Sequence, residues 1–536
     1  MSFPLPRRAT LGLLLVTLST AVAPAQPLAS TPQKIVHHFP VDSPGVPAAL
    51  RAASGPTRVS ASDGAVWELA FFTIGGKRVP KGIWRTDSKA THPWDQRQYF
   101  AGKRYLPSDD VLHLLPDNAR GVWVRTPAAI THIELIPVTL EQKAAFFEER
   151  VHLRHTRHGF VADSHLSTPG DISTNQLAST DNDGLWTAIY AASQCFRYAV
   201  TKSPEALARA RLTVEAVLYL EQVTGRPGYP ARSYIVPSEP RPKDGTWHWT
   251  PDGSKLWKSD TSSDELVGHY YLFALAHDLL DDPALKSKIA ATTRRITDHI
   301  LDNGLQLTDI HGQPTYWGRW SKEYFASPRG KGDSPLNALE ILSFLKAAHH
   351  ITGEPRYDAE YRRLAGPGGY AAITTQLDVL RQQINYSDEE LAMLPFHLLF
   401  LYERDPALLT TYRAALAQWW RNIAREANPL WSLIYATSGA KPDFEAAFRT
   451  LYRIPMDLIN WTVENSHRTD IDWEPDADRH GRRQSRTLLA PDERPVMKWN
   501  GNPFRTDGGN GGRSEDDGAF FLLPYWMARY QKVDIP

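Results

Sequence analysis

The spacing of hydrophobic and polar positions changes near residue 140. Before it, short runs of β-branched and aromatic residues are broken by Gly, Pro and Asp, as in SASDGAVWELAFFT over residues 60–73. This pattern is typical of short strands joined by turns. From Thr139 onward, apolar residues recur every three to four positions, which indicates amphipathic helices. The pattern therefore predicts a β-rich domain over residues 26–140 and a helical domain over residues 141–536.

The helical half has a repeating organisation. The clearest apolar stripe starts in STDNDGLWTAIYAASQCFR, residues 179–197, and comprises Leu185, Ile189, Ala192, Phe196 and Ala199. Proline after an acid or serine is a helix start signal, because its missing N–H is not needed in the first turn. This signal recurs at Ser203-Pro204, Asp282-Pro283, Glu354-Pro355 and Asp405-Pro406. The sequence thus predicts successive helix pairs joined by a tight turn.

The connections between these pairs are long, at roughly residues 225–262, 304–334 and 452–518. Antiparallel helical hairpins with short turns at one end and long loops at the other predict a mainly α fold, an (α/α) barrel. Its mouth carries the N-termini of the inner helices together with the long loops, which is where function is expected.

Residues 140–530 resemble the six-hairpin (α/α)6 carbohydrate-active enzymes, through the hairpin rhythm and the aromatic and acidic long loops. That superfamily includes inverting glycoside hydrolases, sugar epimerases and toroidal polysaccharide lyases. The resemblance rests on architecture and implies an (α/α)6 barrel that acts on a carbohydrate. Residues 60–73 and 115–135 are similar to the propeller repeats of two-component regulators. Two copies cannot close a propeller, so we expect a small β domain docked on the barrel.

Charge and cysteine content narrow the classes of partner. Lys plus Arg and Asp plus Glu both number 60, so no net field attracts the chain to nucleic acid or to an anionic membrane. The single cysteine, Cys195, excludes an internal disulfide and a cysteine metal cluster. The predicted partner is a poly- or oligosaccharide.

The first 25 residues have the pattern of a secretory signal. Arg7 and Arg8 precede an apolar run, and a small-x-small cleavage site ends at Ala25. No later apolar stretch is long enough to span a bilayer. We therefore expect a secreted or periplasmic protein with no membrane span in the mature chain.

Acidic residues precede the predicted inner helices. Acids there can simply stabilise helix N-termini, by about 0.3–1 kcal/mol each. Convergence at one rim would instead supply the protonated and ionised carboxyl groups that glycosidic hydrolysis requires. We predict that the acid and base come from different hairpins, one of Asp181 or Asp183 and one of Asp264 or Glu265, with Glu323 in reserve.

Aromatic and polar residues in or beside the same long loops favour a sugar cleft. An indole ring covers the apolar face of a pyranose, while Arg and other polar side chains bond its hydroxyl groups. Alternatively, these residues pack the loops together. The predicted substrate-binding residues of this group are Trp186, Arg232, His269, Tyr270, Trp317, Arg319 and Trp320.

The polar stretch VENSHRTDID, residues 463–472, indicates a chemistry other than hydrolysis. Asn465 or Arg468 would neutralise a uronate carboxylate, while His467 or a tyrosine, Tyr270 or Tyr271, would remove the C5 proton, as in a polysaccharide lyase or epimerase. A solvated loop is the competing interpretation. A second alternative is a non-catalytic periplasmic sugar-binding or sensor protein.

The sequence predicts no metal and no cofactor. The stretch Asp181-Asn182-Asp183-Gly184 begins like a calcium loop but lacks the later bidentate glutamate of an EF-hand. The histidines show no recognised zinc-ligand spacing.

Overall fold

The computed structural model describes residues 30–380, 383–495, 498 and 500–534. The predicted secretory signal, residues 1–25, lies outside the described residues. Within the part of the chain that the structure describes, none of the helices combines the length and the hydropathy needed to span a bilayer.

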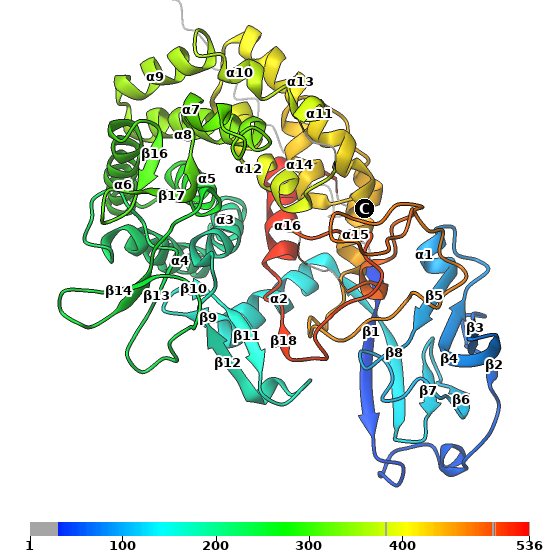
Figure 1. Ribbon diagram of the computed structural model, residues 1–536. Helices are drawn as coiled ribbons and strands as arrows, with labels where there is room; N and C mark the ends of the chain where they lie inside the picture. Colours follow the sequence, from blue (N-terminus) through cyan, green and yellow to red (C-terminus); the bar gives the residue numbers. More distant parts are fainter. Residues whose placement is uncertain (1–29, 381–382, 496–497, 499, 535–536) are drawn as a thin grey trace, which may run out of the picture.

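The N-terminal region forms two four-stranded antiparallel sheets, at the lower right of Figure 1. The first sheet has the order β1-β8-β7-β6, with bounds Ser30–Phe39, Ile130–Thr139, Val122–Arg125 and His113–Pro116. The second has the order β2-β3-β4-β5, with bounds Arg58–Ser60, Val66–Ile74, Lys77–Thr86 and Arg97–Phe100. Side chains from both sheets share one hydrophobic core, so the region is a β-sandwich.

The two propeller-like tryptophans occupy different environments. Trp67 on β3 is fully buried between the sheets, 4.9 Å from the Phe100 ring, and its Nε1 donates to the Arg120 carbonyl. Trp123 on β7 is half-buried and stacks on His132 at a centroid distance of 4.0 Å. Because the two segments lie in different sheets of one sandwich, they do not form equivalent propeller blades.

Among the described residues, six inner helices form a closed ring. Each contacts the next in the order α3, α5, α8, α12, α14 and α16, and α16 returns to α3. Their bounds are Asp183–Thr201, Ser263–Leu279, Ser334–Thr352, Tyr386–Tyr402, Pro429–Thr437 and Ala519–Gln531. Figure 1 shows this ring at the centre of the molecule, which confirms the predicted (α/α)6 barrel.

Each inner helix packs against an outer one. The outer helices are α4 (Pro204–Gln222), α6 (Pro283–Asp302), α9 (Pro355–Ala365), α13 (Pro406–Ile423), α15 (Phe444–Arg453) and α2 (Leu140–Arg154). The predicted proline starts are confirmed at α4, α6, α9 and α13. At α6, for example, the Asp282 carboxylate accepts from the Leu285 N–H at 3.1 Å, which satisfies one of the orphan donors of the first turn.

Short elements fill the connections. The helices are α1 (Pro93–Gln96), α7 (Lys322–Ala326), α10 (Tyr370–Ile373) and α11 (Leu377–Leu380). The strands are β9 (Thr156–Arg157), β10 (Phe160–Val161), β11 (Asp163–Leu166), β12 (Asn175–Ala178), β13 (Ser233–Ile235), β14 (Trp247–Trp249), β15 (Leu256–Lys258), β16 (Gln306–Thr308), β17 (Pro314–Arg319) and β18 (Ser514–Glu515).

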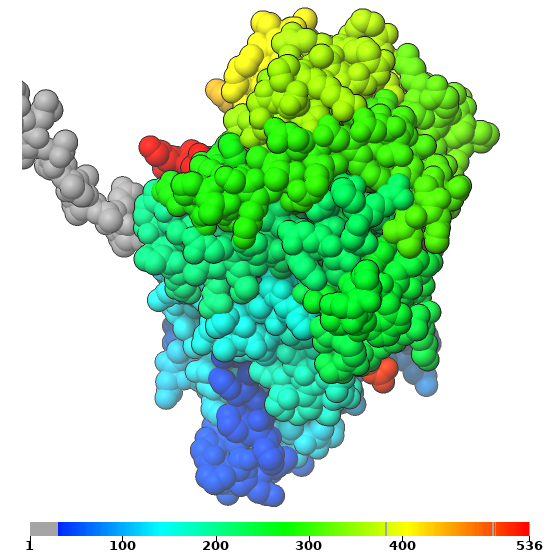
Figure 2. Space-filling model, turned by 90° about the vertical axis from the view of Figure 1, so that its left-hand side faces the viewer, coloured from blue at the N-terminus to red at the C-terminus, as the bar shows by residue number. Residues whose placement is uncertain are grey.

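The sandwich packs directly on the barrel. Figure 2 shows the N-terminal residues, in blue, at one pole of the molecule and continuous with the helical residues above them. The Lys143 ammonium on α2 bridges the two parts, donating to the Gln33 side chain at 3.1 Å and to the Leu451 carbonyl at 3.0 Å.

Helices α3 and α5 approach each other closely through glycine. A Cβ at Gly268 would lie 2.7 Å from the Leu185 Cα, and a Cβ at Gly184 would lie 2.1 Å from the Glu265 Oε2. Both distances are shorter than a normal van der Waals contact, so these positions require the absence of a side chain.

We predict that Gly184→Ala destabilises the fold by about 1–3 kcal/mol, because the added methyl group overlaps a buried carboxylate that has little room to move. Chemical denaturation measures the free energy of unfolding. Gly332→Ala is the matched control: no atom lies within 4 Å of its Cβ position, so its stability should stay within about 0.5 kcal/mol of wild type. Equal stability of the two variants would contradict the close packing.

Candidate functional site

Acidic residues from several inner helices gather at one end of the barrel. The inner helices α3, α5, α8, α12 and α14 share one direction, because each is followed by a short turn and an antiparallel outer helix; the last inner helix, α16, packs on α2 and completes the ring. Their N-termini and the long loops therefore meet at one mouth. Within the described residues, the acids at or near these N-termini include Asp181, Asp183, Asp260, Asp264, Glu265, Asp333, Asp388, Glu389, Glu390, Glu426, Asp516 and Asp517, and Glu340 lies further along α8.

Asp183, predicted as a catalytic acid, lies inside the wall. Its side chain is fully buried, accepting from the Arg157 Nη2 at 2.7 Å and the Ser233 hydroxyl at 2.6 Å. The Thr180 N–H donates to its other oxygen at 2.8 Å. Burial raises the pKa of Asp183, and the Arg157 charge opposes that effect. Both oxygens of Asp183 are hydrogen-bonded and its side chain has no exposed surface. Asp183 therefore holds the loop before α3 in place and does not reach a substrate, which corrects the prediction. Its neighbour Asp181 is exposed and pairs with Lys258.

Glu265 and His269 are also covered. Glu265 has no exposed surface; Gly184 lies against one oxygen, and the Leu185 N–H donates weakly to the other at 3.5 Å. Burial raises its pKa well above the ordinary value. The His269 Nδ1 is 2.6 Å from the Glu265 carbonyl, and burial lowers the pKa of His269 to about 4. Both side chains are part of the α3–α5 contact, which corrects their predicted roles at the substrate.

Tyr270 and Trp320 have structural partners as well. The Tyr270 hydroxyl is 2.8 Å from the Thr297 hydroxyl on α6, and its ring stacks on Phe344 at 4.4 Å. Tyr270 therefore points toward the outer layer of the barrel. Trp320 is fully buried, and its Nε1 donates to the Glu340 carboxylate at 2.8 Å. Neither ring is available as a sugar platform, contrary to the prediction.

Three carboxyl groups face one another at the mouth, on α5, α8 and α12. Burial and the neighbouring Asp388 charge raise the pKa of half-buried Asp264, while Arg232 opposes the shift. Burial, together with Asp264 and Asp388, raises the pKa of Glu340 well above its ordinary value. Asp388 thus lies near enough to Asp264 and Glu340 to raise the pKa of both, so the three carboxyl groups form one electrostatic group.

Arg232 ties the loops that carry these acids. Its guanidinium donates to the Asp181 carbonyl at 2.6 Å, the Asn182 side chain at 2.8 Å and the Asp260 carbonyl at 2.9 Å. Asn182 in turn is 3.5 Å from the Asp264 carboxylate. Arg232 thus connects the loop before α3 to the loop before α5 at the mouth.

A second group of polar residues lies before α16. Burial and the Asp517 and Asp163 charges raise the pKa of Asp516 to about 6, while Lys498 opposes them. The Lys498 ammonium is 3.4 Å from the Asp163 carboxylate and 5.0 Å from the centre of the Trp186 ring. Asp516, Lys498 and Trp186 are each half-buried, so part of each side chain reaches solvent.

Glu390 and Glu426 form a buried carboxyl pair next to this group. Burial raises the pKa of both, and a hydrogen bond between them requires that one stays protonated. The Arg494 charge lowers both pKa values. These three residues and Lys498 line a cavity of about 40 Å³.

Exposed aromatic rings stand on the loops beside α5. Trp249 on β14 is 54% exposed, and Tyr316 and Trp317 on β17 are 48% and 45% exposed. The Tyr316 N–H donates to the Asp260 carboxylate at 2.8 Å, which joins β17 to the loop before α5. The Arg329 guanidinium lies 3.0 Å from the centre of the Tyr316 ring, so one face of that ring is covered.

The remaining predicted residues near these loops have lesser roles. The Arg319 side chain turns back on its own strand, donating to the Thr315 carbonyl at 2.7 Å. Glu323 is exposed in the first turn of α7.

The alternative group, Asn465, His467 and Arg468, lies against the sandwich. His467 contacts the Tyr99 hydroxyl at 3.2 Å and the Phe72 ring at 4.6 Å. Asn465 donates to the Glu493 carbonyl at 2.7 Å, and Arg468 pairs with the Glu493 carboxylate at 2.9 Å. These residues join the two domains. Because Tyr270 points toward α6, the structure does not bring it to His467, which corrects the predicted lyase-type arrangement.

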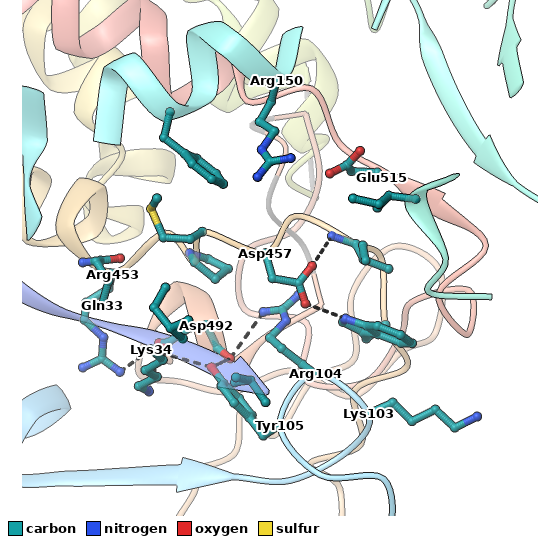
Figure 3. A pocket seen from close by; sticks show the side chains of 18 of the residues that line it. Gln33, Lys34, Lys103, Arg104, Tyr105, Arg150, Arg453, Asp457, Asp492 and Glu515 are labelled. Atoms are coloured by element: carbon teal, nitrogen blue, oxygen red, sulfur yellow. Dashed lines mark hydrogen bonds and ion pairs between the residues drawn. The ribbon is translucent and has the colours of Figure 1, made fainter. Parts of the chain in front are cut away.

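The segment 491–494 connects the sandwich to the mouth. Figure 3 shows the interdomain cavity of about 380 Å³, with Lys34, Tyr105 and Asp492 on one side. Asp492 pairs with Lys34 of β1 and with Arg453 of α15, at 2.8 Å for the latter. Two residues further, Arg494 faces the Glu390–Glu426 pair.

No role was assigned from the sequence to Glu340, Arg494 or Lys498. Glu340 is an acid within the apolar helical run LEILSF, and an acid in such a run indicates a buried polar side chain with a specific role. Arg494 and Lys498 stand in an irregular loop with no periodic pattern. Asp388 and Asp516 are members of acidic runs in which the exposed member cannot be recognised from spacing.

We predict that Asp183→Asn lowers the free energy of unfolding by about 3 kcal/mol, because it leaves the buried Arg157 guanidinium partly uncompensated. Asp264→Asn should change it by less than about 1 kcal/mol, since that carboxyl group is half exposed and burial already disfavours its charged form. Urea denaturation of both variants checks this. Equal losses would mean that Asp264 is also a structural acid.

No protein-family model matches the chain, and no curated protein matches its sequence. Solved structures with some likeness include a family 76 glycoside hydrolase from a bovine Bacteroides thetaiotaomicron strain, at 9% identity over 94% of this chain and 99% of the other, with a TM-score of 0.41. A mutant thermostable endoglucanase from Alicyclobacillus acidocaldarius has 11% identity over 88% and 97%, with a TM-score of 0.39. A cellobiose 2-epimerase from Spirochaeta thermophila has 12% identity over 74% and 98%, with a TM-score of 0.36. Because these TM-scores are below 0.5, the functional proposal rests on the geometry of the site and not on the likeness to these structures.

Proposed function

We propose that the chain is an exported carbohydrate-active enzyme, a glycoside hydrolase that cleaves a poly- or oligosaccharide at the mouth of the barrel. The supporting observation is that half-buried carboxyl groups with raised pKa values stand on two sides of this mouth. Asp516 precedes α16, while Asp264 and Asp388 flank α8, the helix opposite α16 in the ring.

Hydrolysis of a glycosidic bond needs one carboxylic acid and one carboxylate. In this proposal Asp516, with its pKa of about 6, donates a proton to the leaving oxygen. Asp388, with Asp264 beside it, acts as the base that takes a proton from the attacking water. The Asp388 charge raises the pKa of Asp264, so the two carboxyl groups act on each other electrostatically.

The binding groups proposed for the sugar surround these acids. Trp186, which lies under Lys498, would stack against a pyranose ring at the reacting position. Trp249, Tyr316 and Trp317 would hold further sugar units along the loops beside α5. Lys498 and Arg232 would bond hydroxyl groups near the acids.

We predict that Asp516→Asn lowers kcat by about 10²–10⁴-fold, since an amide cannot deliver the proton, with little change in KM. Steady-state kinetics on a responsive glycan would measure it. Glu205→Gln, on the exposed face of outer helix α4, serves as the matched control and should retain wild-type rates. A non-catalytic sugar receptor would show no turnover in any of the proteins.

The pH profile should follow the same group. Because the acid must be protonated, kcat/KM is expected to fall as pH rises through about 6, the pKa of Asp516. Replacing Asp516 with Asn should remove this limb from the residual activity. A limb that persists in the variant would assign the proton donor to another residue.

Hydrolysis and elimination give different products. We expect a panel of neutral and uronic glycans to yield reducing ends without new ultraviolet absorbance, because His467 and Asn465 are engaged in the interdomain contact. Absorbance near 235 nm would reveal the unsaturated product of a lyase and contradict the proposal.

A further inference from the structure

Two histidines and an aspartate meet at the end of the barrel opposite the mouth. His277 and Asp278 lie in the last turn of α5, and His350 lies in the last turn of α8. Their ligand-type atoms, one from each residue, all lie within 4.8 Å of one another. This cluster is remote from the acids assigned to catalysis, so it does not depend on the proposed function.

The distances in the cluster suit a tetrahedral metal ion. The Asp278 Oδ1 is 2.7 Å from the His350 Nε2 and 3.3 Å from the His277 Nδ1. With metal–ligand bonds of about 2.0–2.1 Å, tetrahedral geometry separates ligand atoms by about 3.3 Å. Small side-chain rotations would therefore open a position equidistant from the three atoms.

A fourth residue orients this group. The Tyr402 hydroxyl, at the end of α12, donates to the Asp278 Oδ2 at 2.8 Å, which leaves Oδ1 to face the histidines. The Tyr402 ring also stacks on the His350 ring at a centroid distance of 4.0 Å. Hydrogen bonds that fix a ligating carboxylate are the usual support of a metal site.

The electrostatic setting favours a cation. The C-termini of α5, α8 and α12 end here, and each carries the negative end of its helix dipole. The three side chains are 26–36% exposed, so an ion can enter from solvent.

We propose that His277, Asp278 and His350 form a zinc site that clamps the ends of α5 and α8, with water completing the coordination. Two imidazoles and one carboxylate are ligands typical of Zn²⁺, whereas Ca²⁺ and Mg²⁺ prefer oxygen alone. The site holds the closed end of the barrel together and exposes an open coordination position to solvent.

Zinc binding to the purified, untagged protein tests the proposal, because a histidine tag would itself bind metal. After treatment with chelator and dialysis, calorimetric titration with ZnCl₂ should show one equivalent bound per chain, together with a rise in Tm. Cobalt substituted for zinc should give the visible absorption of a tetrahedral complex. Binding should weaken as pH falls through the range in which histidine protonates.

Variants assign the ligands. His277→Gln and His350→Gln should each weaken zinc binding by at least about tenfold, and Tyr402→Phe by about tenfold through loss of orientation. The exposed His480, outside the cluster, supplies the control His480→Gln, which should bind as wild type does. Circular dichroism checks that each variant is folded.

Two results would overturn the zinc site. One is a wild-type protein that binds no stoichiometric zinc and shows no Tm shift, which would make the cluster an ordinary hydrogen-bonded group. The other is unchanged affinity in folded His277→Gln and His350→Gln. If a variant fails to fold, the wild-type titration and the cobalt spectrum still decide.

Discussion

The structure depends on compensating the charges buried between the sandwich and the barrel. Moving an ion out of water costs several kcal/mol, so a buried carboxylate is stable only when cations and donors surround it. Asp492 receives Lys34 from β1 and Arg453 from α15, and the Tyr105 hydroxyl donates to its carbonyl at 3.2 Å. These partners come from both domains. The segment 491–494 is therefore held in place only when the domains are in contact.

This constraint extends to the mouth. Glu493 is fixed by the Tyr99 N–H at 3.1 Å and by Arg468, and the next residue, Arg494, faces the Glu390–Glu426 pair. Arg494 supplies the positive charge that offsets the cost of burying those carboxyl groups. The sandwich thus contributes to the electrostatics of the mouth without reaching it. The β domain therefore fixes the segment whose Arg494 lowers the pKa of that carboxyl pair.

The pKa values of carboxyl groups at the mouth are raised because these groups are buried and lie near other negative charges. Asp264, Glu340 and Asp388 come from three helices whose N-termini converge, and each raises the pKa of its neighbours or is raised by them. At the opposite end the same helices present their C-termini, and there His277, Asp278 and His350 form a cluster. The parallel arrangement of inner helices therefore gives the two ends of the barrel opposite electrostatic character.

The sequence by itself determined the helical hairpins, their starts and the change from β to α near residue 140, because periodicity and capping residues are local properties. It also indicated Asp264, Trp186 and Trp317 as candidate site residues. Only the tertiary structure decided which member of each acidic run faces solvent. Asp264 and Glu265 are adjacent in the sequence, but successive side chains of a helix point in different directions. The Asp264 carboxyl group is therefore accessible, whereas that of Glu265 is covered by Gly184. Likewise, His350 stands 72 residues from Asp278 and meets it only through the packing of α5 on α8. Burial and proximity are set by neighbours distant in the chain, so no local pattern contains them.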